Sequence, residues 1–104
     1  MKAVSYVGDT FLTGDEIAAA IIDYVVALAN AGHADRVAVP VIGPAGPSVY
    51  EILIGPASQL SAAPVPDAGP ELEDEAFVAD LRARIARERG GWLATQNSSV
   101  DWDL

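Results

Sequence analysis

The stretch TGDEIAAAIIDYVVALANAGHADRVAVPVIGPAGPSVYEILI, residues 13–54, decides the fold of this chain. It opens with an alanine-rich apolar segment long enough for a helix. Two short runs rich in β-branched residues follow, separated by the glycine- and proline-rich segment at 43–47. This order of patterns predicts one long helix and then an antiparallel hairpin.

The helix has recognisable start and stop signals. Thr13 and Glu16 have the spacing of a capping box, and Gly32 suits the left-handed residue that ends many helices. We therefore expect a helix from about Gly14 to Ala31. Apolar side chains occupy most of its circumference: Ile17, Ala18, Ile21, Ile22, Tyr24, Val25, Val26, Leu28 and Ala29. Such a helix needs cover on a second side.

Three strands are expected around this helix. Residues 36–42 and 48–54 form the hairpin, and residues 2–7 form a strand that ends at the turn signal Gly8-Asp9. Pro40 lacks a backbone N–H and cannot donate to a sheet ladder. The first hairpin strand is therefore predicted to be an edge strand, or to be bulged near Pro40.

A second helix is predicted from Pro70 to about Arg89, ended by Gly90 and Gly91. Its apolar stripe consists of Phe77, Val78, Leu81 and Ile85. Acidic residues fill its first half and four arginines its second half, which suits the helix dipole, and Asp80 and Arg84 have the spacing of an ion pair one turn apart. Between hairpin and helix, residues 57–69 read as a surface connection with a short helical turn at 58–62.

These elements predict a small two-layer α+β domain with the order β-α-β-β-α, in which the long helix packs on a short antiparallel or mixed sheet. Residues 1–91 are expected to form this single domain. Residues 92–104 are expected to form an acidic and aromatic C-terminal tail.

Composition excludes several functional classes. The chain has 104 residues, which is the size of one domain, and no cysteine, which removes disulfides, thiolate nucleophiles and thiolate metal sites. Its formal net charge of -9 disfavours binding to nucleic acids. No secretory signal or membrane-spanning segment is visible, so a cytoplasmic location is expected.

No catalytic motif is present in the sequence. His33 is the sole histidine, and it is expected in a solvated loop or at the end of the first helix, because no HExxH pattern or second histidine accompanies it. The serines lack a GxSxG context, and the glycine-proline turns lack a P-loop ending. We predict no catalytic residue, no metal and no cofactor, and the chain leans away from being an enzyme.

A binding pocket is one alternative. Tyr24, Tyr50 and Glu51 could supply its polar groups if it lies between the first helix and the hairpin. Glu51 is the notable carboxylate because it lies inside a predicted strand. It is expected on the open face of the hairpin or paired with an arginine such as Arg36.

The C-terminal tail favours an interaction role. Trp92, Val100, Trp102 and Leu104 are apolar residues interleaved with polar ones, and they are expected either to insert into a partner or to fold back onto the domain. The leading hypothesis is a non-enzymatic interaction or regulatory module that forms a homodimer. A small-molecule-binding protein or small enzyme is the second hypothesis. An acidic mimic of nucleic acid is the third, although the arginines at 82, 84, 87 and 89 interrupt its acidic surface.

Overall fold

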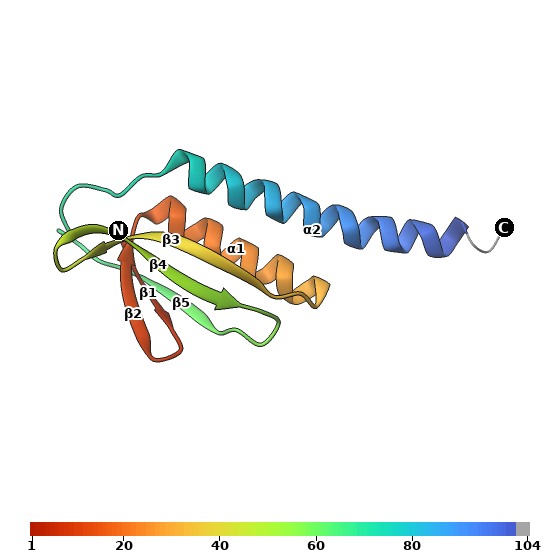
Figure 1. The fold of residues 1–104 in the computed structure, drawn as a ribbon, viewed down its shortest axis with the longest axis horizontal. Helices are drawn as coiled ribbons and strands as arrows, with labels where there is room; N and C mark the ends of the chain where they lie inside the picture. The colour runs from red at the N-terminus through yellow and green to blue at the C-terminus, as the bar shows by residue number, and fades with distance from the viewer. Residues whose placement is uncertain (102–104) are drawn as a thin grey trace.

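The computed structural model describes the backbone of residues 1–101 and the side chains of residues 1–90. The elements are β1 (Lys2–Tyr6), β2 (Asp9–Thr13), α1 (Asp15–Ala31), β3 (Asp35–Gly43), β4 (Gly46–Ile54), β5 (Leu60–Pro64) and α2 (Glu75–Asp101). The strands form one antiparallel five-stranded sheet in the order β4-β3-β2-β1-β5 (Figure 1). The predicted α+β class is confirmed, and the sheet has two strands more than the sequence indicated.

The first hairpin joins β1 to β2 through Val7 and Gly8. Both residues have positive φ angles, 51° and 81°, as the two central residues of a type I′ turn require. The turn signal at Gly8 is confirmed. The second strand of this hairpin, β2, was not predicted, because its residues DTFLT also read as the approach to a helix.

The second hairpin joins β3 to β4 and confirms the predicted antiparallel pair. The register runs from Asp35 opposite Ile54 to Gly43 opposite Gly46, so each strand has nine residues and the connection is shorter than expected. The inward side chains of β3 are Val37, Val39 and Val41, and they are buried. Because successive side chains of each strand point to opposite sides, the hairpin has one buried face and one open face.

Pro40 does not mark an edge, so that part of the prediction is wrong. β3 lies between β4 and β2, although it pairs with β2 at one position, Leu12 opposite Ile42. The hydroxyl of Thr13 donates to the carbonyl oxygen of Pro40 (2.7 Å). In a strand, the nitrogen and carbonyl of one residue point to the same side. The Pro40 nitrogen therefore faces β2, and β4 loses no hydrogen bond.

The same bond explains why the predicted capping box is absent. The Thr13 hydroxyl is committed to Pro40, and Thr13 is the last residue of β2. Gly14 is the N-cap of α1 and makes no side-chain capping bond. The other end of the helix is as predicted: Gly32 is left-handed (φ 72°), and its N–H reaches the carbonyls of Leu28 and Ala29.

The predicted helical turn at 58–62 is also wrong. Residues 60–64 form β5, which pairs with β1 from Leu60 opposite Tyr6 to Pro64 opposite Lys2. The sequence LSAAP has no β-branched or aromatic residue, so β propensity gives no signal. Pairing with β1 decides the conformation instead.

The second helix begins later and ends later than predicted. Asp74 accepts a hydrogen bond from the N–H of Phe77 (3.0 Å), so the start of α2 lies at Glu75. The helix continues through Gly90 and Gly91 to Asp101, so the predicted stop at this pair is wrong. Figure 1 shows α2 alongside α1 and extending past its end.

The core gathers one face of α1, the inward side chains of the sheet and part of α2. Leu81 and Ile85 of α2 are buried in the same cluster as Ile17, Ile21 and Leu28 of α1. The second cover that α1 requires is thus supplied within the domain, and Val26 remains its exposed large side chain. Neither helix, as far as residue 101, is both long and apolar enough to span a bilayer.

Candidate functional site

A polar cluster joins α1, β3 and α2 at one end of the domain. The hydroxyl of Tyr24 donates to Asp35 Oδ2 (2.5 Å), and Arg84 donates to the same oxygen (3.0 Å). Arg84 also contacts Asp80 one turn earlier (2.9 Å), which confirms the predicted pair. Tyr24 itself is buried. Side chains from three elements therefore meet at one carboxylate.

The pKa values in this cluster follow from burial and hydrogen bonding. Burial, together with the bond to Asp35, raises the pKa of Tyr24 to about 12, so this phenol is a hydrogen-bond donor at neutral pH. Burial alone would raise the pKa of the Asp35 carboxyl. The hydrogen bonds from Tyr24 and from the Arg36 N–H, with the charge of Arg84, outweigh it and lower that pKa below 3.8.

Two further side-chain contacts hold α2 at the same end. Arg82 contacts Asp23 of α1 (2.6 Å), and Glu88 contacts Nδ1 of His33 (2.7 Å). A polar pocket of about 520 Å³ lies among these groups and also contains Arg87. The charged groups are arranged to neutralise one another across the helix contact. This cluster anchors α2 to α1 and β3.

Replacing Tyr24 with phenylalanine tests this anchoring role. The Tyr24→Phe variant should lose about 1 to 2 kcal/mol of unfolding free energy at pH 7, because Asp35 loses a donor in a partly buried site. Asp35 has a lowered pKa when folded, so its contribution is present above the unfolded pKa and is lost as the pH falls through the folded one. The deficit of the variant should shrink as the pH falls below the ordinary range of carboxyl pKa values. Urea denaturation at several pH values measures it.

Tyr50→Phe is the matched control. The Tyr50 hydroxyl donates to Asp9 (2.8 Å), but this bond is exposed to solvent. Its loss should cost less than about 1 kcal/mol. Equal losses in the two variants would show that the Tyr24 cluster does not anchor the helix.

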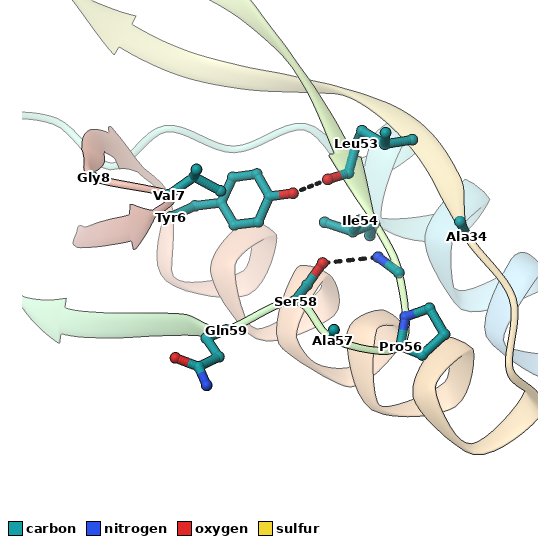
Figure 2. A pocket seen from close by; sticks show the side chains of 11 residues that line it. Tyr6, Val7, Gly8, Ala34, Leu53, Ile54, Pro56, Ala57, Ser58 and Gln59 are labelled. Carbon is teal, nitrogen blue, oxygen red and sulfur yellow. Dashed lines mark hydrogen bonds between the residues drawn. The ribbon is translucent and has the colours of Figure 1, made fainter.

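A second pocket, of about 670 Å³, opens where β4 runs into the loop to β5 (Figure 2). The Tyr6 side chain crosses toward β4 and donates to the carbonyl oxygen of Leu53. Ser58 accepts from the N–H of Gly55 (2.8 Å) and closes the loop on the other side. The exposed Val7 lines the same pocket from the tip of the first hairpin. The lining is largely apolar, with few polar groups.

The face of the sheet that points away from α1 is open to solvent. We call it the outer face. Cross-strand neighbours form an apolar row across it: Val49 with Pro40, Ile42 with Leu12, Leu12 with Ala3, and Ala3 with Ala63. Val49 and Leu53 on this face expose 66% and 65% of their surface. Val49 belongs to the apolar row, whereas Leu53 is separated from it by Glu51 and lies opposite Arg36.

The remainder of the outer face is almost uncharged. Thr10, Ser5 and Ser61 lie side by side on β2, β1 and β5, and the hydroxyls of Ser5 and Thr10 are 3.1 Å apart. Arg36 and Glu51 are the charged residues whose positions point to this face, and they contact each other at 3.7 Å. The outer face therefore carries no net charge in a chain of net charge -9.

The structure does not bring the predicted ligand-binding residues together. Tyr24 lies in the polar cluster, Tyr50 points inward and packs on Phe11 with ring centroids 5.3 Å apart, and Glu51 points to the outer face. The expected pairing of Glu51 with Arg36 on the open face is confirmed. Neither pocket described above is lined by Tyr50 or Glu51. A shared ligand for the three residues remains a prediction.

The predicted partner-binding residues lie at the limit of the structure. Trp92 and Val100 belong to α2 by their backbone, and their side chains fall outside the described residues. Trp102 and Leu104 lie outside the described residues altogether. The division of the chain at residue 91 and the role of the tail remain predictions.

Sequence reasoning missed the outer face as a unit. Alternation within each strand predicts which residues point outward, but the apolar row depends on the register between strands and on β2 and β5. Within the described side chains, no group of three or more histidine, aspartate or glutamate residues could hold a metal ion. Comparison of the chain with family models, curated proteins and solved structures gave no match in any of the three.

Proposed function

We propose that the protein is a non-enzymatic interaction module that self-associates through its outer face. The observation that carries this proposal is the apolar row across the five strands, with Val49 and Leu53 left exposed. Burying such a row against another apolar surface is favourable, because it removes apolar area from water.

Charge supports a second copy as the partner. Two chains of net charge -9 repel each other, so contact is favoured where the acids are fewest. The outer face meets that condition. Its one cation and one anion, Arg36 and Glu51, also allow a two-fold arrangement in which each arginine lies near the partner copy's carboxylate.

The size of the outer face is sufficient for a modest dimer. Five strands spaced by about 4.8 Å span about 24 Å, and strands of five to nine residues extend for about 17 to 30 Å. Each copy could thus bury about 500 Å², or about 1,000 Å² in total, which is near the lower limit for a specific interface. A dissociation constant in the micromolar range is therefore expected.

The Leu53→Asp variant tests the proposal. Each substitution acts twice in a two-fold interface, so the dimer dissociation constant should rise by about 100-fold or more. The fold should be unaffected, because Leu53 is exposed in the monomer. Sedimentation equilibrium over a range of protein concentrations measures the constant.

Val26→Asp is the matched control, because Val26 is also an exposed apolar residue but lies on α1. It should leave the dimer intact. A wild-type protein that stays monomeric at 100-fold its expected dissociation constant would refute self-association. Equal weakening by both substitutions would refute the outer face as its site.

A further inference from the structure

The two edges of the sheet differ in their capacity to accept another strand. β5 is short and ends at Pro64, with Pro66 close behind, which are common ways of blunting an edge. β4 is nine residues long, and within residues 1–101 no strand pairs with it on its far side from β3. An unpaired edge of this length can accept an extended chain by backbone hydrogen bonding.

The register shows which backbone groups are free on β4. Pro40 directs its carbonyl toward β2, so its opposite residue, Val49, forms a pair without hydrogen bonds. Every second pair has the same character, and these include Glu51 and Leu53. The N–H and C=O groups of these three β4 residues therefore point to the free edge. The bond from Tyr6 to the Leu53 carbonyl confirms this direction independently and occupies that carbonyl, so the groups offered to an added strand are those of Val49 and Glu51.

Exposed apolar side chains gather around this edge. Among residues 1–90, the large apolar side chains that are exposed are Val7, Val26, Val49 and Leu53. Three of these four lie on β4 or line the pocket at its end, the exception being Val26 on α1. Val7 also holds a positive φ of 51°, which is strained for a β-branched residue. Strain and exposure at one residue beside a pocket are features of binding sites.

We infer that the free edge of β4 and the adjoining pocket of Figure 2 form a strand-addition site for an extended, basic segment of another protein. Its backbone pairs with Val49 and Glu51. A bulky apolar side chain enters the pocket beside Val7 and Tyr6. Lysine or arginine residues on either side are favoured by Glu51, by Asp9 next to Tyr50, and by the net charge of -9.

This strand-addition site is distinct from the contact proposed for self-association. The outer face uses the side chains of Val49 and Leu53, whereas the edge uses the backbone of β4, although Leu53 also lines the adjoining pocket. An added strand would extend the sheet at its rim and leave the apolar row uncovered. The tests of strand addition and of self-association can therefore give independent results.

A labelled peptide serves as the probe: nine residues of alternating lysine and leucine, carrying fluorescein and followed by fluorescence anisotropy. A second probe has the same sequence, but every other backbone nitrogen is methylated. The methylated nitrogens are those that would otherwise donate hydrogen bonds to β4. Wild-type protein should bind the first probe at least tenfold more tightly than the second. Equal binding of both probes would overturn the inference, because charge alone would then explain it.

Two substitutions act on the site without disturbing the ladder between β3 and β4. Glu51→Pro removes an N–H that faces the free edge, and Val7→Asn relieves the positive φ while removing the apolar side chain at the pocket. Each substitution should lower the affinity for the first probe at least fivefold. Glu51→Gln controls for the lost charge, and Val26→Asn controls for a lost apolar side chain elsewhere. Val26→Asn should retain more than half of the affinity, and Glu51→Gln, which removes a charge that favours the basic probe, should weaken binding less than Glu51→Pro does.

Circular dichroism measures whether the two site variants remain folded, and both are expected to do so. Unchanged probe affinity in folded Glu51→Pro would overturn the inference. The inference is also overturned if Glu51→Pro converts a dimer to a monomer without changing probe affinity, because a second copy would then occupy the edge. A monomeric wild type that still binds the first probe selectively would support the inference while refuting self-association.

Discussion

Replacing Leu81 with alanine is expected to lower the free energy of unfolding by about 3 to 5 kcal/mol, the range for large cavities in a packed core. Leu81 is fully buried although it lies on α2, which enters the core late in the sequence. Its side chain belongs to the cluster that includes Ile17 and Ile21 of α1. The loss should appear as a lower urea midpoint with little change in the slope of the transition.

Leu53→Ala provides the matched comparison for that substitution. It removes the same atoms from an exposed position and should cost less than about 0.5 kcal/mol in a sample dilute enough to be monomeric. If Leu81→Ala were as mild as Leu53→Ala, α2 would not be part of the core. The anchoring contacts of Arg82 and Arg84 would then have no packing to reinforce.

The Gly14→Ala substitution is expected to have the second largest effect, a loss of about 3 kcal/mol. Gly14 has an ordinary negative φ, so backbone conformation does not require glycine here. Glycine is required by the lack of space, because an added Cβ would collide with the backbone carbonyl oxygen of Leu72. Because the clash is with the backbone, it cannot be relieved by a change of side-chain rotamer.

The clash would also disturb the contacts at the start of α1. Glu71 accepts from the Asp15 N–H (2.5 Å) and from the amino group of Met1 (2.8 Å). These two contacts lower the pKa of the Glu71 carboxyl, with the bond from the Met1 amino group as the larger cause. Displacing residues 71 and 72 would separate these groups, so the start of α1 would lose its nearest acceptor.

Gly90→Ala is the control for Gly14→Ala. Among the atoms that the structure describes, nothing lies within 4 Å of a Cβ added at Gly90, and the residue is inside α2. Alanine there should be neutral or should stabilise the helix by up to about 1 kcal/mol. Thermal unfolding of the two variants measures the contrast. A Gly14→Ala protein as stable as wild type would show that the segment around Leu72 does not cross the start of α1.

The parts of the fold that were predictable are those set by local patterns. The apolar surface of α1, its end at Gly32 and the β3–β4 hairpin depend on residues close together in sequence, and all three are confirmed. The order of charges along α2, with acidic residues first and arginines later, is also predictable from the sequence. Its arginines, however, were interpreted as complementing the helix dipole, whereas Arg82 and Arg84 pair with acids on other elements.

The parts that were not predictable depend on contacts across the chain. Thr13 resembles a helix cap, yet its hydroxyl bonds to Pro40 because β2 lies beside β3. β5 has no propensity of its own and is formed by pairing with β1. Gly90 resembles a stop, yet the helix tolerates glycine at a cost of about 1 kcal/mol. Predicting the outer face requires the register of all five strands, and local sequence patterns do not determine that register.

The most direct test of the central claim, self-association through the outer face, is disulfide trapping. The chain has no cysteine, so a single introduced thiol reports one position without background. Ala38 lies on the outer face opposite Glu51, and Ala83 is also an exposed alanine but lies on α2. Under mild oxidation, Ala38→Cys is predicted to form a covalent dimer much faster than Ala83→Cys. Equal rates for the two variants, or faster trapping at Ala83, would contradict the claim.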